Sequence, residues 1–165
     1  MCQRCIYVCP MQIDIPALVY QARAAWPREK RPKGILGSCD MALRNESCSA
    51  MGASPEDFQF VVEDVVEEVR ETQPGFEELQ APIDKQGAHF FLNQNSREPV
   101  TEPDEMIPLW KILQHVGADW TYGSYGWAGE NYCMFLADDE AWEHVTRTTA
   151  NQATKLGCKT FLNTE

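Results

Sequence analysis

The chain has 165 residues, of which 44% are hydrophobic, and its formal net charge is −11. This length accommodates one ordinary domain, or a small domain beside a larger one. The negative charge opposes binding to a phosphate backbone, so nucleic acid is not an expected partner. The sequence contains no uninterrupted apolar run of about 18 residues, so no membrane-spanning helix is predicted.

The first ten residues contain a cysteine pattern. Cys2, Cys5 and Cys9 are separated by two and three residues, and Pro10 follows directly. Bacterial ferredoxins bind [4Fe–4S] clusters through the spacing C-x2-C-x2-C-x3-C-P, in which the last cysteine ligates the neighbouring cluster. The three cysteines match the last three of such a run, whose first cysteine would lie before the chain begins. We therefore predict iron–sulfur ligation by these cysteines in a motif that continues upstream.

Zinc is the alternative metal, because a C-x2-C pair is also half of a structural zinc site. Such a site needs a second ligand pair, and no suitable spacing exists among the other four cysteines, Cys39, Cys48, Cys133 and Cys158. The total of seven cysteines is odd, and three of them lie at ligand spacing. This pattern favours a reducing compartment and metal binding over a disulfide framework.

A helix is predicted directly after the motif. Asp14 is a suitable N-cap and Pro16 suits the first helical turn, and apolar residues recur with helical spacing to about Ala25. We expect this helix to pack on the clusters. Residues 1–26 are accordingly assigned to the C-terminal part of a [4Fe–4S] ferredoxin-type domain.

Residues 27–53 have no clear periodicity. Glycines and scattered polar residues predict a loop with at most a short helical turn over residues 40–44. Cys39 and Cys48 lie in this region, and their spacing is not specific for a ligand pair. They are expected to be buried and inert.

A strongly amphipathic, acidic helix is predicted over residues 55–71. Residues 54–57, Ser-Pro-Glu-Asp, supply an N-cap, a proline in the first turn and an acidic capping partner. The following residues 73–87 are rich in proline and glycine and predict a linker. Residues 27–87 are therefore expected to be a connecting region that ends at a domain boundary.

The remainder, residues 88–165, alternates between strands and helices. Short apolar strands and amphipathic helices are predicted in turn over residues 88–92, 105–116, 118–122, 138–156 and 158–162. This alternation predicts right-handed crossovers and a parallel sheet. The expected fold class is α/β: a partial ferredoxin-like helical segment followed by a Rossmann-like β-α-β-α-β half-domain.

Ligands of parallel α/β sheets bind beyond the carboxyl ends of the strands. Residues 93–95, 123–131 and 163–165 follow the three strands and are expected to meet at that rim. The glycine-rich segment among them lacks the G-x-G-x-x-G spacing of a dinucleotide loop. Cys133 is expected to be a partly buried thiol near the rim, and Cys158 a core residue of the third strand.

Three stretches carry a family resemblance: the cysteine motif continuing into QIDIP at 12–16, DWT at 119–121 leading into GWAGENY at 126–132, and TFLNTE at 160–165. With these stretches the chain resembles the heterodisulfide-reductase-related iron–sulfur subunits. That family includes subunits of the sulfite-reductase-associated (Dsr) membrane complexes and of transmembrane cytochrome complexes. Residues 27–115 resemble it only loosely.

In that family, a ferredoxin-like part with two [4Fe–4S] clusters passes electrons to a cysteine-rich CCG domain that acts on disulfides or related sulfur compounds. The resemblance implies that Cys2 and Cys5 ligate one cluster and Cys9 the other, and that residues 88–165 form an incomplete CCG-like domain. It also implies an oxidoreductase subunit on the cytoplasmic side. Partner subunits, among them a membrane cytochrome, would hold it peripherally at the inner face of the membrane.

The chain departs from the family at one important position. The paired Cys-Cys-Gly of the CCG repeat is replaced by Ser124, Tyr125 and Gly126. No catalytic residue is therefore assigned, and the resemblance implies a further cysteine-containing stretch beyond Glu165, as in a piece of a longer protein. The rival hypothesis is a zinc-stabilised interaction module without a redox role.

Overall fold

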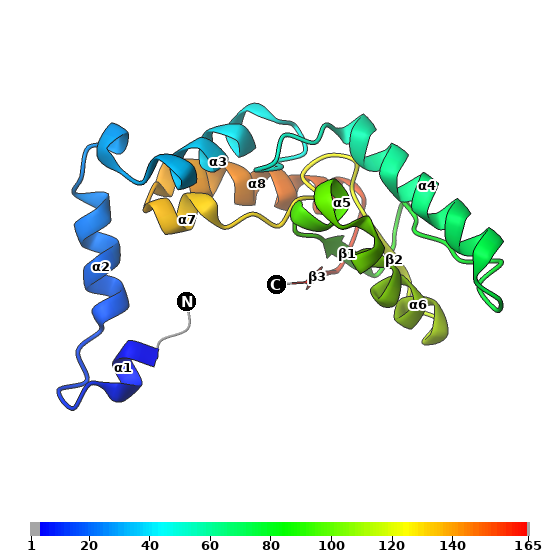
Figure 1. Ribbon diagram of the computed structural model, residues 1–165, viewed down its shortest axis with the longest axis horizontal. Coiled ribbons are helices and arrows are strands. Elements are labelled where there is room, and N and C mark those ends of the chain that lie inside the picture. Colours follow the sequence, from blue (N-terminus) through cyan, green and yellow to red (C-terminus); the bar gives the residue numbers. More distant parts are fainter. Residues whose placement is uncertain (1–3, 165) are drawn as a thin grey trace.

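The computed structural model describes residues 4–164 and shows a small parallel β-sheet with helices on both faces (Figure 1). Among the described residues, no helix combines the length and apolar character needed to cross a membrane. In chain order the elements are α1 (Arg4–Val8), α2 (Ile15–Ala24), η1 (Arg28–Lys30), α3 (Lys33–Arg44), α4 (Pro55–Thr72), β1 (Phe90–Asn93), α5 (Arg97–Thr101), η2 (Pro103–Met106), α6 (Ile107–His115), β2 (Trp120–Thr121), α7 (Tyr132–Leu136), α8 (Asp139–Lys155) and β3 (Thr160–Asn163).

The sheet has three parallel strands in the order β2-β1-β3, which confirms the predicted parallel α/β arrangement. Phe90 of β1 pairs with Trp120 on one side and Thr160 on the other, and the β1–β3 register continues to Asn93 opposite Asn163. The chain adds β2 on one side of β1 and then returns through α7 and α8 to add β3 on the other. The carboxyl ends of β1 and β3 therefore lie side by side.

One face of the sheet is covered by α4 and α6. The helix α4 begins where predicted, because Ser54 and Asp57 form a reciprocal capping box. Its residue Phe58 stacks on Trp127 with ring centroids 4.0 Å apart, so the apolar stripe of α4 shares a core with the sheet. Whether residues 73–87 separate two domains stays a prediction.

The opposite face of the sheet is covered by α8. Side chains alternate along a strand, and in β1 Phe90 and Leu92 pack in the core that contains α4. Phe91 points the other way and packs against Ala153 and Leu156 at the end of α8. The sheet thus forms the middle of three layers.

The helix α3 is a correction to the predicted loop over residues 27–53. Gly34 and Gly37 favour a loop by propensity, but both lie in the helix, and a Cβ at either position would have no atom within 4 Å. Cys39 and Ala42, on the inner side of α3, are fully buried against α7 and α8. Burial of this face outweighs the low helix propensity of the glycines. Two single-turn helices, α5 and α7, were also not predicted.

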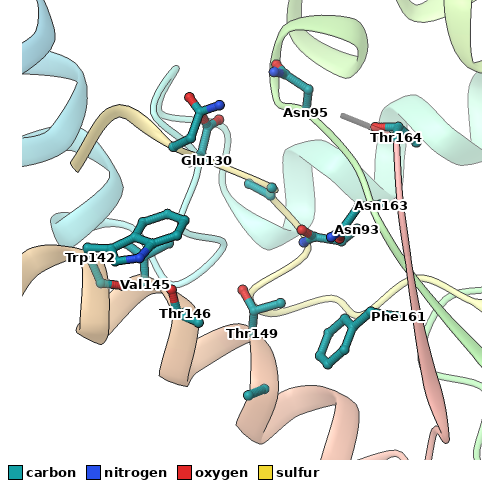
Figure 2. A pocket seen from close by; sticks show the side chains of 14 residues that line it. Asn93, Asn95, Glu130, Trp142, Val145, Thr146, Thr149, Phe161, Asn163 and Thr164 are labelled. Carbon is teal, nitrogen blue, oxygen red and sulfur yellow. Dashed lines mark hydrogen bonds between the residues drawn. The ribbon is translucent and has the colours of Figure 1, made fainter. Parts of the chain in front are cut away.

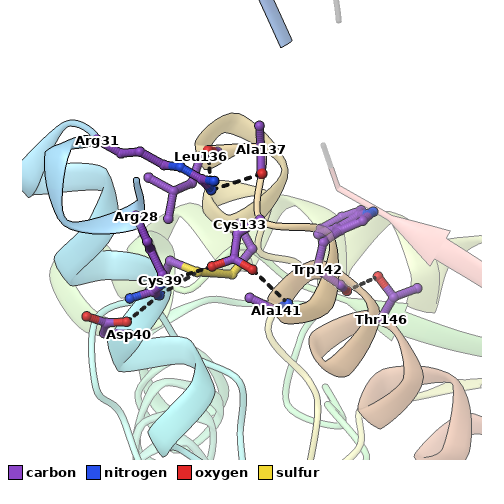
Figure 3. The surroundings of a disulfide bond; sticks show 11 residues. Arg28, Arg31, Cys39, Asp40, Cys133, Leu136, Ala137, Ala141, Trp142 and Thr146 are labelled. Carbon is purple, nitrogen blue, oxygen red and sulfur yellow. Dashed lines mark hydrogen bonds and ion pairs between the residues drawn. A yellow bond between two sulfur atoms is a disulfide. The ribbon is translucent and has the colours of Figure 1, made fainter. Parts of the chain in front are cut away.

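Cys39 of α3 and Cys133 of α7 form a disulfide, with their Cα atoms 5.1 Å apart (Figure 3). Both side chains are buried, with exposed fractions of 0% and 2%. Cys39 is buried as predicted, but it is bonded to Cys133 and is not an inert thiol, and the prediction that Cys133 is a partly buried thiol is wrong. The two residues are 94 positions apart, and only the packing of α3 on α7 brings them together.

The helices α1 and α2 lie at one end of the molecule, away from the sheet (Figure 1). α2 starts as predicted, because the Asp14 carboxylate accepts the N–H of Ala17 at 2.9 Å. Arg23 and Arg31 donate hydrogen bonds to backbone carbonyls of α7 and of the residue that follows it. No residue of α2 is buried, so its predicted apolar face is exposed in the part of the chain that the structure describes.

Candidate functional site

The predicted cluster ligands lie at the amino-terminal end of the described chain. Cys5 lies in α1 and Cys9 follows that helix, so the two are about one helical turn apart. The Cys9 N–H donates to the Ile6 carbonyl at 3.2 Å, and the Cys9 carbonyl accepts the N–H of Gln12 at 3.0 Å. Cys2 lies outside the described residues.

The donor set of this motif fits iron–sulfur ligation in its chemistry and its access. Cys5 is exposed, Cys9 is half-buried, and both thiols are free. Thiolate sulfur is the usual ligand of [4Fe–4S] clusters. Within residues 4–164, no group of three or more His, Cys, Asp or Glu side chains is placed to hold a metal ion. Two of the three predicted ligands, Cys5 and Cys9, lie in this part of the chain.

The two remaining free cysteines lie elsewhere. Cys48 is buried, as predicted; burial and the negative charge of Glu130 raise the pKa of its thiol, although a hydrogen bond with Thr148 opposes them. Cys158 is half-buried against the core beneath α8 and precedes β3, which begins at Thr160, so the prediction of a core position within the third strand is wrong. Burial and the Asp119 carboxylate raise the pKa of Cys158. Neither thiol has the lowered pKa of a reactive cysteine.

A second candidate site is a cavity of about 370 Å³ at the carboxyl ends of the strands, here called the rim cavity (Figure 2). Its walls include Asn93 and Asn95 after β1, residues 128–131 after β2, and Asn163 and Thr164 at the end of β3. All three segments expected at the rim therefore contribute to one cavity, although residues 123–127 do not line it. Glu165 lies outside the described residues.

The loop after β2 is held against β1 by close backbone contacts. Asn93 Nδ2 donates to the Trp127 carbonyl at 2.9 Å, and the N–H of Gly129 donates to the Gln94 carbonyl at 2.6 Å. A Cβ at Gly129 would lie 2.7 Å from Asn93 Oδ1, which explains why glycine is needed here. These contacts determine where the next residue, Glu130, enters the cavity wall.

Glu130 is the only charged residue among the described residues that line the rim cavity. Its carboxylate accepts hydrogen bonds from the Ser96 hydroxyl and from the N–H of Ala50 at 3.2 Å. The side chain is buried, so these donors replace water around the charge. Glu130 thereby joins the loop after β2 to the segments after β1 and α3.

Sequence reasoning missed one wall of the cavity, which is formed by α8. Trp142, Val145 and Thr149 belong to the amphipathic helix predicted over residues 138–156, and they line the cavity together with Thr146 and Ala150. The predicted sheet topology could have indicated this wall, because the helix that precedes β3 crosses the sheet beside the rim. The sequence pattern alone does not distinguish a side chain that fills the core from one that borders a cavity.

The described cavity wall is rich in neutral polar groups. It contains several carboxamide and hydroxyl groups and one carboxylate, but no cysteine, histidine, lysine or arginine. No protein-family model matches this chain, and neither a curated protein nor a solved structure matches it. The chain thus has two separate candidate sites, which are the cysteine motif and the rim cavity.

Proposed function

We propose that this protein is an electron-transfer iron–sulfur subunit of a heterodisulfide-reductase-like redox complex, with Cys2, Cys5 and Cys9 as cluster ligands. The observation that carries the proposal is the spacing of these cysteines before Pro10. The exposure of the free Cys5 thiol and its position one helical turn before Cys9 support it. A bound [4Fe–4S] cluster supplies one-electron transfer.

The surroundings of the motif suit a redox interface. Around Cys5 and Cys9, large apolar side chains are exposed: Tyr7 by 82%, Val8 by 74% and Met11 by 77%. In a complex, such side chains would exclude water from a cluster and contact a partner subunit. This segment would supply the thiolates and an apolar cover for the cluster. Its partners would be a membrane cytochrome and other redox subunits.

The α/β part has a distinct role in this proposal. We assign it to a Rossmann-like half-domain of the CCG type, and the resemblance of residues 119–121, 126–132 and 160–165 supports that assignment. Because the loop at Ser124 has no cysteine, chemistry on a sulfur compound would depend on cysteines outside this segment. The chain itself would then carry electrons and position partners at the cytoplasmic face of the membrane.

Anaerobic reconstitution with ferrous iron and sulfide tests the proposal. We expect the full chain to bind iron and sulfide, with brown colour and an EPR signal on reduction, but at less than one complete cluster per chain. Cys5→Ser and Cys9→Ser should each lose most of the bound iron. Cys158→Ser, which changes a free cysteine outside the motif, should retain it.

Three outcomes would contradict the proposal. Stoichiometric zinc without iron would favour the rival zinc-stabilised interaction module. Iron retained by both Cys5→Ser and Cys9→Ser would remove these cysteines as ligands. A stable, complete four-iron cluster on residues 1–165 alone would show that the alignment of the motif with the ferredoxin run is wrong.

A further inference from the structure

The rim cavity lies where α/β sheets bind ligands. In a parallel sheet whose strand order reverses, the crevice opens between the carboxyl ends of the two strands at the reversal. Here these strands are β1 and β3, which end at the paired residues Asn93 and Asn163. Both residues line the rim cavity. Its position is independent of the cysteine motif and of any metal.

The charge of the cavity limits what it can bind. Among the described lining residues there is no lysine, arginine or histidine, and Glu130 adds a negative charge. A phosphate or carboxylate group would be desolvated there without a cationic partner, which is strongly unfavourable. The cavity therefore selects against anions and favours an uncharged ligand.

Several hydrogen-bonding groups of the wall are available to a ligand. Within residues 4–164, the side chains of Asn131 and Asn163 make no hydrogen bond, and Asn95 uses only its oxygen, which accepts the N–H of Arg97. Each carboxamide offers both a donor and an acceptor. They are placed to bind a ligand that itself carries amide or amino groups.

Thr149 is a further hydrogen-bonding group in the wall. Three other threonines of α8, Thr146, Thr148 and Thr154, donate to the carbonyl four residues earlier, at 2.8–2.9 Å. Thr149 is only 9% exposed, yet its hydroxyl makes no such bond in the described chain. Because Thr149 lines the cavity and its hydroxyl is not engaged in the helix, the hydroxyl is free to donate or accept a hydrogen bond with a ligand.

The apolar parts of the wall favour a flat ligand of limited size. Figure 2 shows the rings of Trp142 and Phe161 on opposite sides of the cavity, with Thr146 and Thr149 between them. Aromatic rings bind planar groups through stacking or edge contacts. A volume of about 370 Å³ is near the lower end of the range for small-molecule sites.

We propose that the rim cavity binds an uncharged, planar heterocycle with amide or amino groups, of the size of a nucleobase or nucleoside. The ligand lies between Trp142 and Phe161, the carboxamides of Asn131 and Asn163 bind its polar edge, and Thr149 donates or accepts one further hydrogen bond. The site gives this chain a ligand-binding role beyond electron transfer.

Isothermal titration calorimetry of residues 1–165 with adenosine and with nicotinamide tests the proposal. At least one of them should bind with a dissociation constant of roughly 0.01–1 mM. Adenosine monophosphate should bind at least about ten-fold more weakly than adenosine, because its phosphate meets no cation. Each of Asn131→Ala, Asn163→Ala and Thr149→Val should weaken binding by roughly three- to ten-fold.

Asn151→Ala is the matched control, because Asn151 is an exposed asparagine of α8 that does not line the cavity. Its affinity should equal that of the unchanged chain, and circular dichroism should show the same helix content for every variant. Lack of saturable binding by both probes overturns the proposal. So does binding of the monophosphate as tight as that of adenosine, or binding that none of the three cavity variants weakens.

Discussion

The disulfide between Cys39 and Cys133 joins α3 to α7 at the point where the amino-terminal segment is attached. Arg31 donates hydrogen bonds to the carbonyls of Leu136 and Ala137 at 3.1 and 3.0 Å, and the Arg28 guanidinium lies beside Cys39 (Figure 3). The disulfide thus lies in the part of the fold to which the amino-terminal segment, with its cysteine motif, is attached.

Removal of this disulfide should destabilise the protein. It joins residues 94 positions apart, and a cross-link of that span typically contributes about 2–4 kcal/mol by restricting the unfolded chain. We expect a loss of this size in the free energy of unfolding for the double variant Cys39→Ser, Cys133→Ser, measured by urea denaturation. Non-reducing peptide mapping should recover the two cysteines in one cross-linked fragment.

Cys158→Ser is the control for the disulfide prediction, since Cys158 is free. Reductant should change the stability of this variant by the same amount as it changes that of the unchanged chain. An identical unfolding midpoint with and without reductant in the unchanged chain would contradict a stabilising disulfide.

Phe58→Ala should be strongly destabilising. The Phe58 side chain is 1% exposed and stacks on Trp127, so its removal leaves a cavity in the main core. The expected loss is about 3–5 kcal/mol, measured by urea denaturation. Phe60→Ala, in the same helix but at a position 68% exposed, should change stability by no more than about 0.5 kcal/mol. Equal effects of the two substitutions would show that α4 does not pack as described.

Asp138 should make part of the stability depend on pH. Burial alone would raise its pKa, but hydrogen bonds from Arg28 and from the N–H of Ala141 outweigh burial and lower it. A carboxylate with a lowered pKa in the folded state stabilises the protein above its unfolded pKa of about 3.9, and this stabilisation is lost as the pH falls through the lower, folded value. Urea denaturation should therefore show a smaller loss between pH 7 and pH 3 in Asp138→Asn than in the unchanged chain.

Arg28→Met tests the same interaction from the other side. Arg28 also pairs with Asp40, and its side chain is 39% exposed, so we expect a loss of about 1 kcal/mol at pH 7. Arg147→Met removes an exposed pair with Glu143 within α8 and should have almost no effect. A pH dependence that is the same in the unchanged chain, Asp138→Asn and Arg28→Met would contradict the role of this pair.

The cysteines should differ in their rates of alkylation. Cys5 is exposed, whereas Cys48 is buried and burial raises the pKa of its thiol. Because the thiolate is the reactive form, iodoacetamide at pH 8 should modify Cys5 quickly and Cys48 only when the protein unfolds. Mass spectrometry of timed samples gives both rates, and urea-unfolded protein provides the reference. Equal rates in the folded protein would contradict the burial of Cys48.

Local signals in the sequence correctly predicted several elements. The capping residues Ser54 and Asp57 determine where α4 begins, and Asp14 does so for α2, because these contacts join residues three apart in the chain. The alternation of strands and helices predicted the parallel sheet, and its topology predicted the rim. The helix α3 was missed, because its stability depends on burying Cys39 against elements distant in sequence.

The sequence by itself determined the spacing of Cys2, Cys5 and Cys9, the bounds of the capped helices and the α/β alternation, since each depends on residues close together in the chain. Only the tertiary structure decided that Cys39 bonds to Cys133 and that α8 forms a wall of the rim cavity. Both depend on how separate elements pack, and a periodic apolar pattern specifies that a face is buried without specifying what covers it.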